Sequence, residues 1–114
     1  MKLVDNGAFT QAIVPMLIPG EEIVSTYKTV RDGVVFTNKR IISINVQGLT
    51  STKKDFTSLP YSKISAYSVE TAGALDLDSE LEMWFSGLGR VKFEFKSNAN
   101  VTEICRLIST YALQ

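Results

Sequence analysis

The stretch VVFTNKRIISI, residues 34–44, decides the fold of this 114-residue chain. Apolar and β-branched residues lie on both sides of the central pair Asn38 and Lys39. β-branched and aromatic residues favour strands, and two such runs separated by two polar residues are typical of a tight hairpin. We therefore predict one strand over 33–37 and a second over 40–46, joined by a two-residue turn.

Further strand-like segments lie on both sides of this hairpin. The segment before it is rich in β-forming residues and ends in Asp32 and Gly33, a common tight-turn pair. After the hairpin, a loop is predicted over 47–52, and Pro60 ends the strand that follows. The additional strands are predicted over 23–31, 53–59, 64–70, 75–85 and 90–96.

The clearest strand pattern covers residues 75–85, where apolar side chains alternate with mostly acidic ones. Such alternation predicts one buried and one solvated face. Residues 90–96 alternate in the same way, with Arg90, Lys92, Glu94 and Lys96 outward, so we expect the two strands to pair through a loop with an odd number of residues. One allowed register places Lys92 opposite Glu82. The expected inward residues are Leu75, Leu77, Leu81, Met83 and Phe85, and the expected outward row is Asp76, Asp78, Glu80, Glu82 and Trp84.

Helical patterns occupy both ends of the chain. Within residues 1–20, apolar side chains recur at the spacing of one helical face, with a helix expected to end near Ile13 and a second turn to begin at Pro15. This helical segment either packs on a partner subunit or covers the core of its own domain. Residues 21–114 are predicted to form the main domain, which ends in an amphipathic helix capped by Asn100.

The composition excludes several classes of function. With 12 basic and 12 acidic residues the formal net charge is zero, so bulk positive charge does not favour nucleic-acid binding. The chain has no histidine, which removes histidine bases and metal ligands, and the single Cys105 excludes an internal disulfide. We therefore expect no catalytic residues, no metal and no cofactor. No apolar run approaches the ~20 residues of a membrane span, so a cytoplasmic protein is expected.

Short motifs follow one another in a defined order from about residue 17 onwards. They are IPGEE at 18–22, RD at 31–32, VFTNKRI at 35–41, QGLT at 47–50, LPYSKI at 59–64, ETAG at 70–73 and LDSEL at 77–81. In this order they resemble the bacterial pleckstrin-homology (PH) domain family over most of the chain. The resemblance implies a mainly β fold, a bent antiparallel barrel of about seven strands capped by a C-terminal helix. It also implies rings of identical subunits. Ser51 departs from the family pattern, in which a glycine is expected.

Basic residues near the first hairpins are candidates for ligand binding. PH domains that bind phosphoinositides place several Lys and Arg residues around the first hairpin, and here Lys28, Arg31 and Lys39 are candidates for contact with an anionic lipid or phosphate. Asp32 beside Arg31 interrupts the basic row, and the alternative is that these cations are simply solvated. Arg40 is expected instead to tie the hairpin to a nearby carboxylate or carbonyl group.

The outward acidic row also allows two interpretations. Same-face residues of a strand lie ~6.5–7 Å apart, which disperses carboxylates and disfavours a metal site. The row formed by Asp76, Asp78, Glu80, Glu82 and Trp84 is therefore either a solvated face or an oligomer interface with Trp84 as an anchor. The leading hypothesis is a non-enzymatic PH-like module that assembles with itself, with a possible protein partner. The alternative is a module that binds an anionic lipid or a phosphate ligand.

Overall fold

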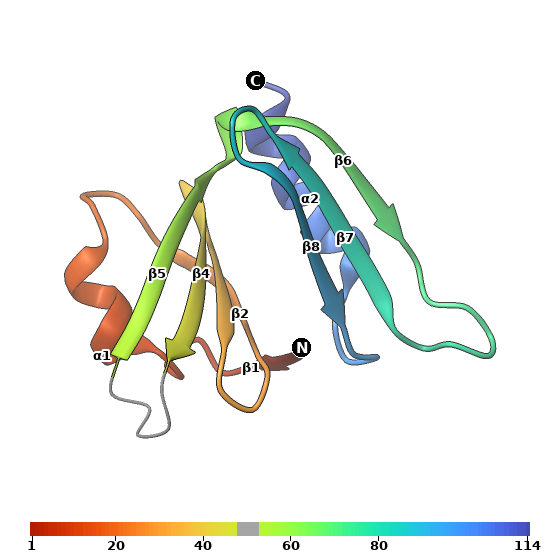
Figure 1. The fold of residues 1–114 in the computed structure, drawn as a ribbon, viewed down its shortest axis with the longest axis horizontal. Helices are drawn as coiled ribbons and strands as arrows, with labels where there is room; N and C mark the ends of the chain where they lie inside the picture. The colour runs from red at the N-terminus through yellow and green to blue at the C-terminus, as the bar shows by residue number, and fades with distance from the viewer. Residues whose placement is uncertain (48–52) are drawn as a thin grey trace. The chain divides into compact units, whose positions relative to one another are not determined.

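The computed structural model describes residues 1–47 and 53–114. Residues 48–52 lie outside the described residues. They include Ser51 and all but the first residue of the loop predicted over 47–52. The chain forms two compact units, one of residues 3–59 and one of residues 1–2 with 60–114, and each contains an antiparallel sheet (Figure 1). A mainly β fold that ends in a helix, as predicted, is therefore confirmed.

The first unit is built on a five-stranded sheet in the order β1-β2-β3-β4-β5. Its central hairpin is the predicted one: Val35 pairs with Ile42 and Phe36 with Ile41, and the chain turns at Asn38 and Lys39. The local pattern was sufficient here because both strands carry β-forming residues and the turn is polar. The strands are β1 (Lys2–Val4), β2 (Ile23–Lys28), β3 (Gly33–Thr37), β4 (Arg40–Gln47) and β5 (Lys53–Pro60).

The strand predicted over 23–31 ends three residues early, at Lys28. Lys28 pairs with Gly33, so the chain reverses over residues 29–32 rather than at Asp32 and Gly33. The physical reason is local side-chain bonding: the Thr29 hydroxyl accepts a bond from the Asp32 backbone N–H at 3.0 Å. Such a bond competes with continuation of the strand.

The N-terminal segment covers the core of its own unit. Ile13, at the end of the single-turn helix α1 (Thr10–Ile13), is buried in a cluster with Val35, Ile42 and Ile44. The next turn is the 3₁₀ helix η1 (Val14–Met16), which contains Pro15 near its start. Both helical turns lie where the apolar spacing predicts them, but the segment also contributes strand β1, which the sequence pattern did not indicate.

The second unit has a three-stranded sheet in the order β6-β7-β8. Glu82 lies opposite Lys92, and Phe85 pairs with Gly89, which leaves three residues in the loop, an odd number as expected. Gly89 has φ of +100°, a left-handed conformation that favours glycine. The elements are η2 (Tyr61–Lys63), β6 (Ile64–Glu70), β7 (Ser79–Phe85), β8 (Gly89–Phe95) and α2 (Val101–Ala112).

Strand β7 begins at Ser79, and the prediction of a strand from residue 75 is wrong. Residues 75–78 belong to the β6–β7 loop, where the Gly73 N–H donates to the Asp76 carbonyl at 2.7 Å. The Asp78 N–H also donates to Asp76 Oδ1 at 3.0 Å. These turn bonds replace strand bonds. Leu75 and Leu77 are consequently exposed rather than inward, and Asp76 and Asp78 do not continue the row on β7.

The final helix forms as predicted and packs on the three-stranded sheet through β6 and β7. Asn100 caps it by accepting a bond from the Glu103 N–H at 3.3 Å. The Tyr67 hydroxyl on β6 lies 2.6 Å from the Ser109 hydroxyl on α2. In residues 1–47 and 53–114, no helix has the length and apolar character that a membrane span needs.

Candidate functional site

Arg40 forms four side-chain hydrogen bonds within the first unit. Its guanidinium donates through Nε to Glu21 Oε2 at 2.9 Å and through Nη2 to Glu21 Oε1 at 3.1 Å. The same group donates to Ser58 Oγ and to the Met16 carbonyl, both at 2.9 Å. Arg40 therefore joins the segment before β2 to β4 and β5, which is the structural role expected from the sequence.

Thr37 and Asn38 complete this connection. The Thr37 hydroxyl lies 2.7 Å from Glu21 Oε2 and accepts bonds from the backbone N–H groups of Lys39 and Arg40 at 3.0 Å. The Asn38 amide donates to the Gly20 carbonyl at 3.0 Å. The motifs at 18–22 and 35–41 are therefore joined by hydrogen bonds that hold the hairpin.

The Glu21 carboxylate is fully enclosed, with no exposed side-chain surface. Burial by itself raises the pKa of this carboxyl, but the hydrogen bonds from Arg40 and Thr37, and the Ile18 N–H, outweigh burial and lower the pKa below its ordinary value. Glu21 is thus ionised and paired at neutral pH. A group held in this way stabilises the fold and is not available as a proton donor.

The three basic candidates do not lie together. Lys28 pairs with Gly33 at one end of β3, and Arg31 lies in the adjacent β2–β3 loop. Lys39 lies in the turn at the opposite end of β3, after Thr37. At ~3.3 Å per residue this strand separates the two ends by more than 10 Å. A single compact phosphate group therefore cannot contact all three residues.

Lys28 has a further contact within the chain. Its Nζ lies 5.9 Å from the centre of the Phe9 ring, which is within cation–π range. Between Lys28 and Arg31, the Val30 side chain is 94% exposed. The β2–β3 loop therefore presents an apolar tip between two basic residues.

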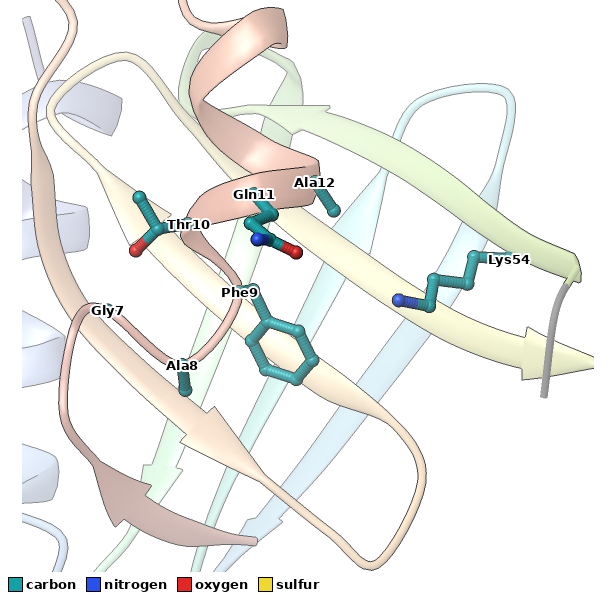
Figure 2. A pocket seen from close by; sticks show the side chains of 7 residues that line it. All are labelled: Gly7, Ala8, Phe9, Thr10, Gln11, Ala12 and Lys54. Atoms are coloured by element: carbon teal, nitrogen blue, oxygen red, sulfur yellow. The ribbon is translucent and has the colours of Figure 1, made fainter.

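A pocket of about 380 Å³ opens beside α1, lined by residues 7–12 and Lys54, and we call it the Phe9 pocket. Figure 2 shows Gln11 from α1 and Lys54 from β5 extending toward one another above the Phe9 ring. The Phe9 ring lies so close to Gly33 that a Cβ there would be 2.4 Å from ring atoms. No local sequence pattern predicts this pocket, because Lys54 on β5 and residues 7–12 come together only in the folded chain.

The outward carboxylates on β7 form ion pairs with two basic residues on β8. Lys92 Nζ lies 2.8 Å from Glu80 Oε1, and Arg90 Nη1 lies 3.9 Å from Glu82 Oε1. The hydrogen bond that Lys92 donates to Glu80, together with the negative charge of Glu80, raises the pKa of Lys92. Asp78, in the loop before β7, lies 3.3 Å from Lys96. Of the four expected carboxylates, Asp78, Glu80 and Glu82 are therefore already paired within the chain.

Trp84 shares the outward face with Glu80 and Glu82 and is partly exposed. Asp76 and Asp78 lie in the loop before β7, so only Glu80, Glu82 and Trp84 of the predicted set of five share this face. Among the described residues, no group of three or more acidic or cysteine side chains is arranged to hold a metal ion. The face combines paired charges with one large aromatic residue, and it is acidic where Glu80 lies between Glu70 on β6 and Glu94 on β8.

Comparison with known proteins matches residues 1–112 to the family described as "Bacterial PH domain". The chain is 40% identical over 110 residues to the uncharacterized protein YjqA of Bacillus subtilis, covering 95% of this chain and 88% of that protein. It also resembles a crystal structure of a DUF1696 family protein with a pleckstrin-homology domain from Shewanella loihica. That likeness has a TM-score of 0.85 and 36% identity, covering 97% of this chain and 96% of the other.

A second solved structure is similar to this chain. It is a pleckstrin-homology domain from Shewanella amazonensis, with a TM-score of 0.72 and 42% identity, covering 97% of this chain and 90% of the other.

Proposed function

Because this chain belongs to the bacterial PH domain family, we propose that it is a non-enzymatic module that assembles with copies of itself, as a ring in the cytoplasm. PH folds serve as scaffolds for several kinds of partner, so the partner must be argued from the residues. Histidine is absent, and the most buried carboxylate, Glu21, is occupied by Arg40. One free cysteine, Cys105, suits a reducing compartment.

The observation that carries this proposal is the β6–β7 loop, residues 71–78, which we call the Leu75 loop. Leu75 is 102% exposed and Leu77 is 60% exposed. The bonds that Asp76 accepts from Gly73 and Asp78 hold this loop in shape. A preformed apolar projection loses little conformational entropy when it binds a partner, so it is suited to contact with another protein.

The charge around these leucines favours a protein surface over a membrane. Asp76 and Asp78 lie beside Leu75 and Leu77, and Glu70 ends the strand before the loop. Carboxylates are repelled by the negative potential of an anionic leaflet. We therefore assign the Leu75 loop to a contact between proteins.

Two further surfaces are suited to contacts between copies. The three-stranded sheet ends at β6 and β8 among the described residues, and an edge strand can pair with another chain. Met1 already bonds the backbone of β8 at Glu94 and Lys96, so β6 is the edge suited to such pairing. The outward face of β7 adds Trp84, a residue type enriched at the centre of interfaces. Since Glu80 and Glu82 are paired within the chain, we expect Trp84 to contribute more to a contact between copies than these two carboxylates do.

The test is the mass of the protein in solution, measured by light scattering after size-exclusion chromatography. The wild-type chain at micromolar concentration should elute as an oligomer, and a strict monomer would refute the proposal. Leu75→Ser with Leu77→Ser should reduce the mass. Both side chains are exposed and contribute little to folding, so a lower mass would report a lost contact between copies. Leu88→Ser with Leu113→Ser, two other exposed leucines, is the matched control and should retain the wild-type mass.

A second candidate function is binding to an anionic membrane surface through the β2–β3 loop. The observation that favours it is exposed Val30 between Lys28 and Arg31. Basic residues contribute ~1 kcal/mol each near an anionic leaflet, so binding through this loop would be weak and sensitive to salt. Co-sedimentation with anionic and neutral liposomes at low salt tests it. Equal recovery with both liposomes would exclude it, and Lys39→Ala should not change the result.

A further inference from the structure

We propose that the Leu75 loop of one copy inserts into the Phe9 pocket of the next copy. This inference rests on the proposed self-assembly and specifies which surfaces meet. The loop offers Leu75, Asp76 and Leu77 in sequence, an acidic residue between two apolar ones. The pocket offers apolar surface from Phe9 and two alanines, beside polar side chains that include the cation of Lys54.

The size of the pocket is suitable for a leucine side chain. Its volume is about 380 Å³, and a dry protein cavity of ~150 Å³ already holds a benzene ring. Ala8, Phe9 and Ala12 supply apolar surface on the α1 side. Burying one leucine on such a surface is favourable by the hydrophobic effect, because Leu75 is otherwise fully in water.

The charges favour the same pairing. Lys54 lines the pocket and forms no ion pair with the residues that the structure describes. Asp76 uses Oδ1 to accept the Asp78 N–H, and its carboxylate still carries a negative charge that can face Lys54 of the next copy. Opposite charges at an interface select the partner and its orientation more than they add affinity.

The contact would be heterologous, because the loop and the pocket are different surfaces of the same chain. Each copy then offers one loop and one pocket, and repetition of such a contact closes into a ring when the rotation between copies allows closure. A two-fold dimer would instead require one surface to meet itself. The proposed pairing therefore accounts for a ring with a single type of contact.

Two blocking variants test the contact. Leu75→Asp places a charge on the loop, and Ala8→Trp fills the pocket at an exposed position. Each variant alone should be monomeric. Mixed together they should form a one-to-one dimer and nothing larger, because the first variant keeps an intact pocket and the second keeps an intact loop. Leu113→Asp, at another exposed leucine, should retain the wild-type mass.

The outcomes separate this inference from the proposed function. A monomeric wild-type chain would overturn self-assembly and this contact together. A wild-type oligomer that either blocking variant leaves intact would overturn the contact while self-assembly stands. Monomeric variants that fail to combine when mixed would also overturn it, and would leave the pocket to a small ligand or another protein.

A charge exchange tests the assigned ion pair. Lys54→Glu and Asp76→Lys should each weaken assembly by roughly tenfold, a typical effect for opposed charges at an interface. The two changes combined in one chain should restore assembly, and failure to restore it would overturn the pairing of these residues. Lys53→Glu, at the neighbouring position on β5, is the matched control and should have no effect.

Discussion

Arg40 and Glu21, 19 residues apart in the chain, form a forked ion pair with N–O distances of 2.9 and 3.1 Å. Glu21 is fully buried at its side chain, whereas Arg40 is 23% exposed. The pair joins the start of β4 to the segment that leads into β2. Each oxygen of the carboxylate has a second donor, Thr37 or the Ile18 N–H, so the buried charge is completely hydrogen-bonded.

Removing Arg40 should destabilise the fold strongly. Arg40→Ala leaves the Glu21 carboxylate buried without its cation, and breaking a buried pair in this way costs about 3 kcal/mol. Arg40→Lys should reduce the free energy of unfolding by a smaller amount. Some loss is still expected, because a lysine cannot also make the bonds to Ser58 and Met16. Urea denaturation measures both. An unchanged unfolding midpoint in Arg40→Ala would contradict the structural role.

Acid should weaken the fold through Glu21. The pKa of Glu21 is lowered in the folded chain, so the unfolded chain takes up a proton at higher pH, near the ordinary value of 4.5. The stabilisation is therefore fully present above that pH and is lost as the pH falls through the lower folded pKa. Thermal melts across this range should show a smaller acid-induced loss in Glu21→Gln than in the wild type. The exposed neighbour Glu22→Gln is the control.

Gly33→Ala should be destabilising because of Phe9. The added Cβ would lie 2.4 Å from two atoms of the Phe9 ring, and forcing a side chain into packed space costs about 1–3 kcal/mol. In a Phe9→Ala background the same change should cost clearly less, since the ring is gone. A double-mutant cycle in urea measures this coupling. An equal loss in the free energy of unfolding in both backgrounds would show that the Phe9 ring does not contact Gly33.

The contact between α2 and β6 should be measurable at one hydroxyl pair. Tyr67→Phe removes the hydroxyl that lies 2.6 Å from Ser109 Oγ, and we expect a loss of about 1 kcal/mol in the free energy of unfolding. Ser109→Ala should cost a similar amount. The double variant should cost less than the sum of the two, and full additivity would show that the bond does not form in solution.

Local patterns were reliable where neighbours in sequence set the structure. The β3–β4 hairpin, the β7–β8 register and the cap at Asn100 all depend on residues close together in the chain. The alternation over residues 75–85 failed at its start, because Asp76 forms turn bonds that a strand pattern cannot reveal. Side-chain competition of this kind is a property of the folded loop.

For the candidate sites too, the sequence predicted relations between neighbouring residues and not relations between distant ones. The sequence indicated that Lys28 and Arg31 lie near each other, because only two residues separate them. It also indicated that Glu80, Glu82 and Trp84 share one face, because every second side chain of a strand points to the same side. It could not show that Lys39 lies at the far end of β3. Nor could it show that each acidic residue of β7 has a basic partner on β8.

The sequence by itself determined the family, the strand-rich fold, the closing helix and the absence of histidine chemistry, because composition and short-range periodicity carry that information. Only the tertiary structure decided that Arg40 satisfies the buried Glu21, that Phe9 and Lys54 share a pocket, and that Leu75 projects into solvent. These features depend on contacts between residues distant in the chain, or on turn bonds that form only in the folded loop. No pattern of neighbouring residues encodes them.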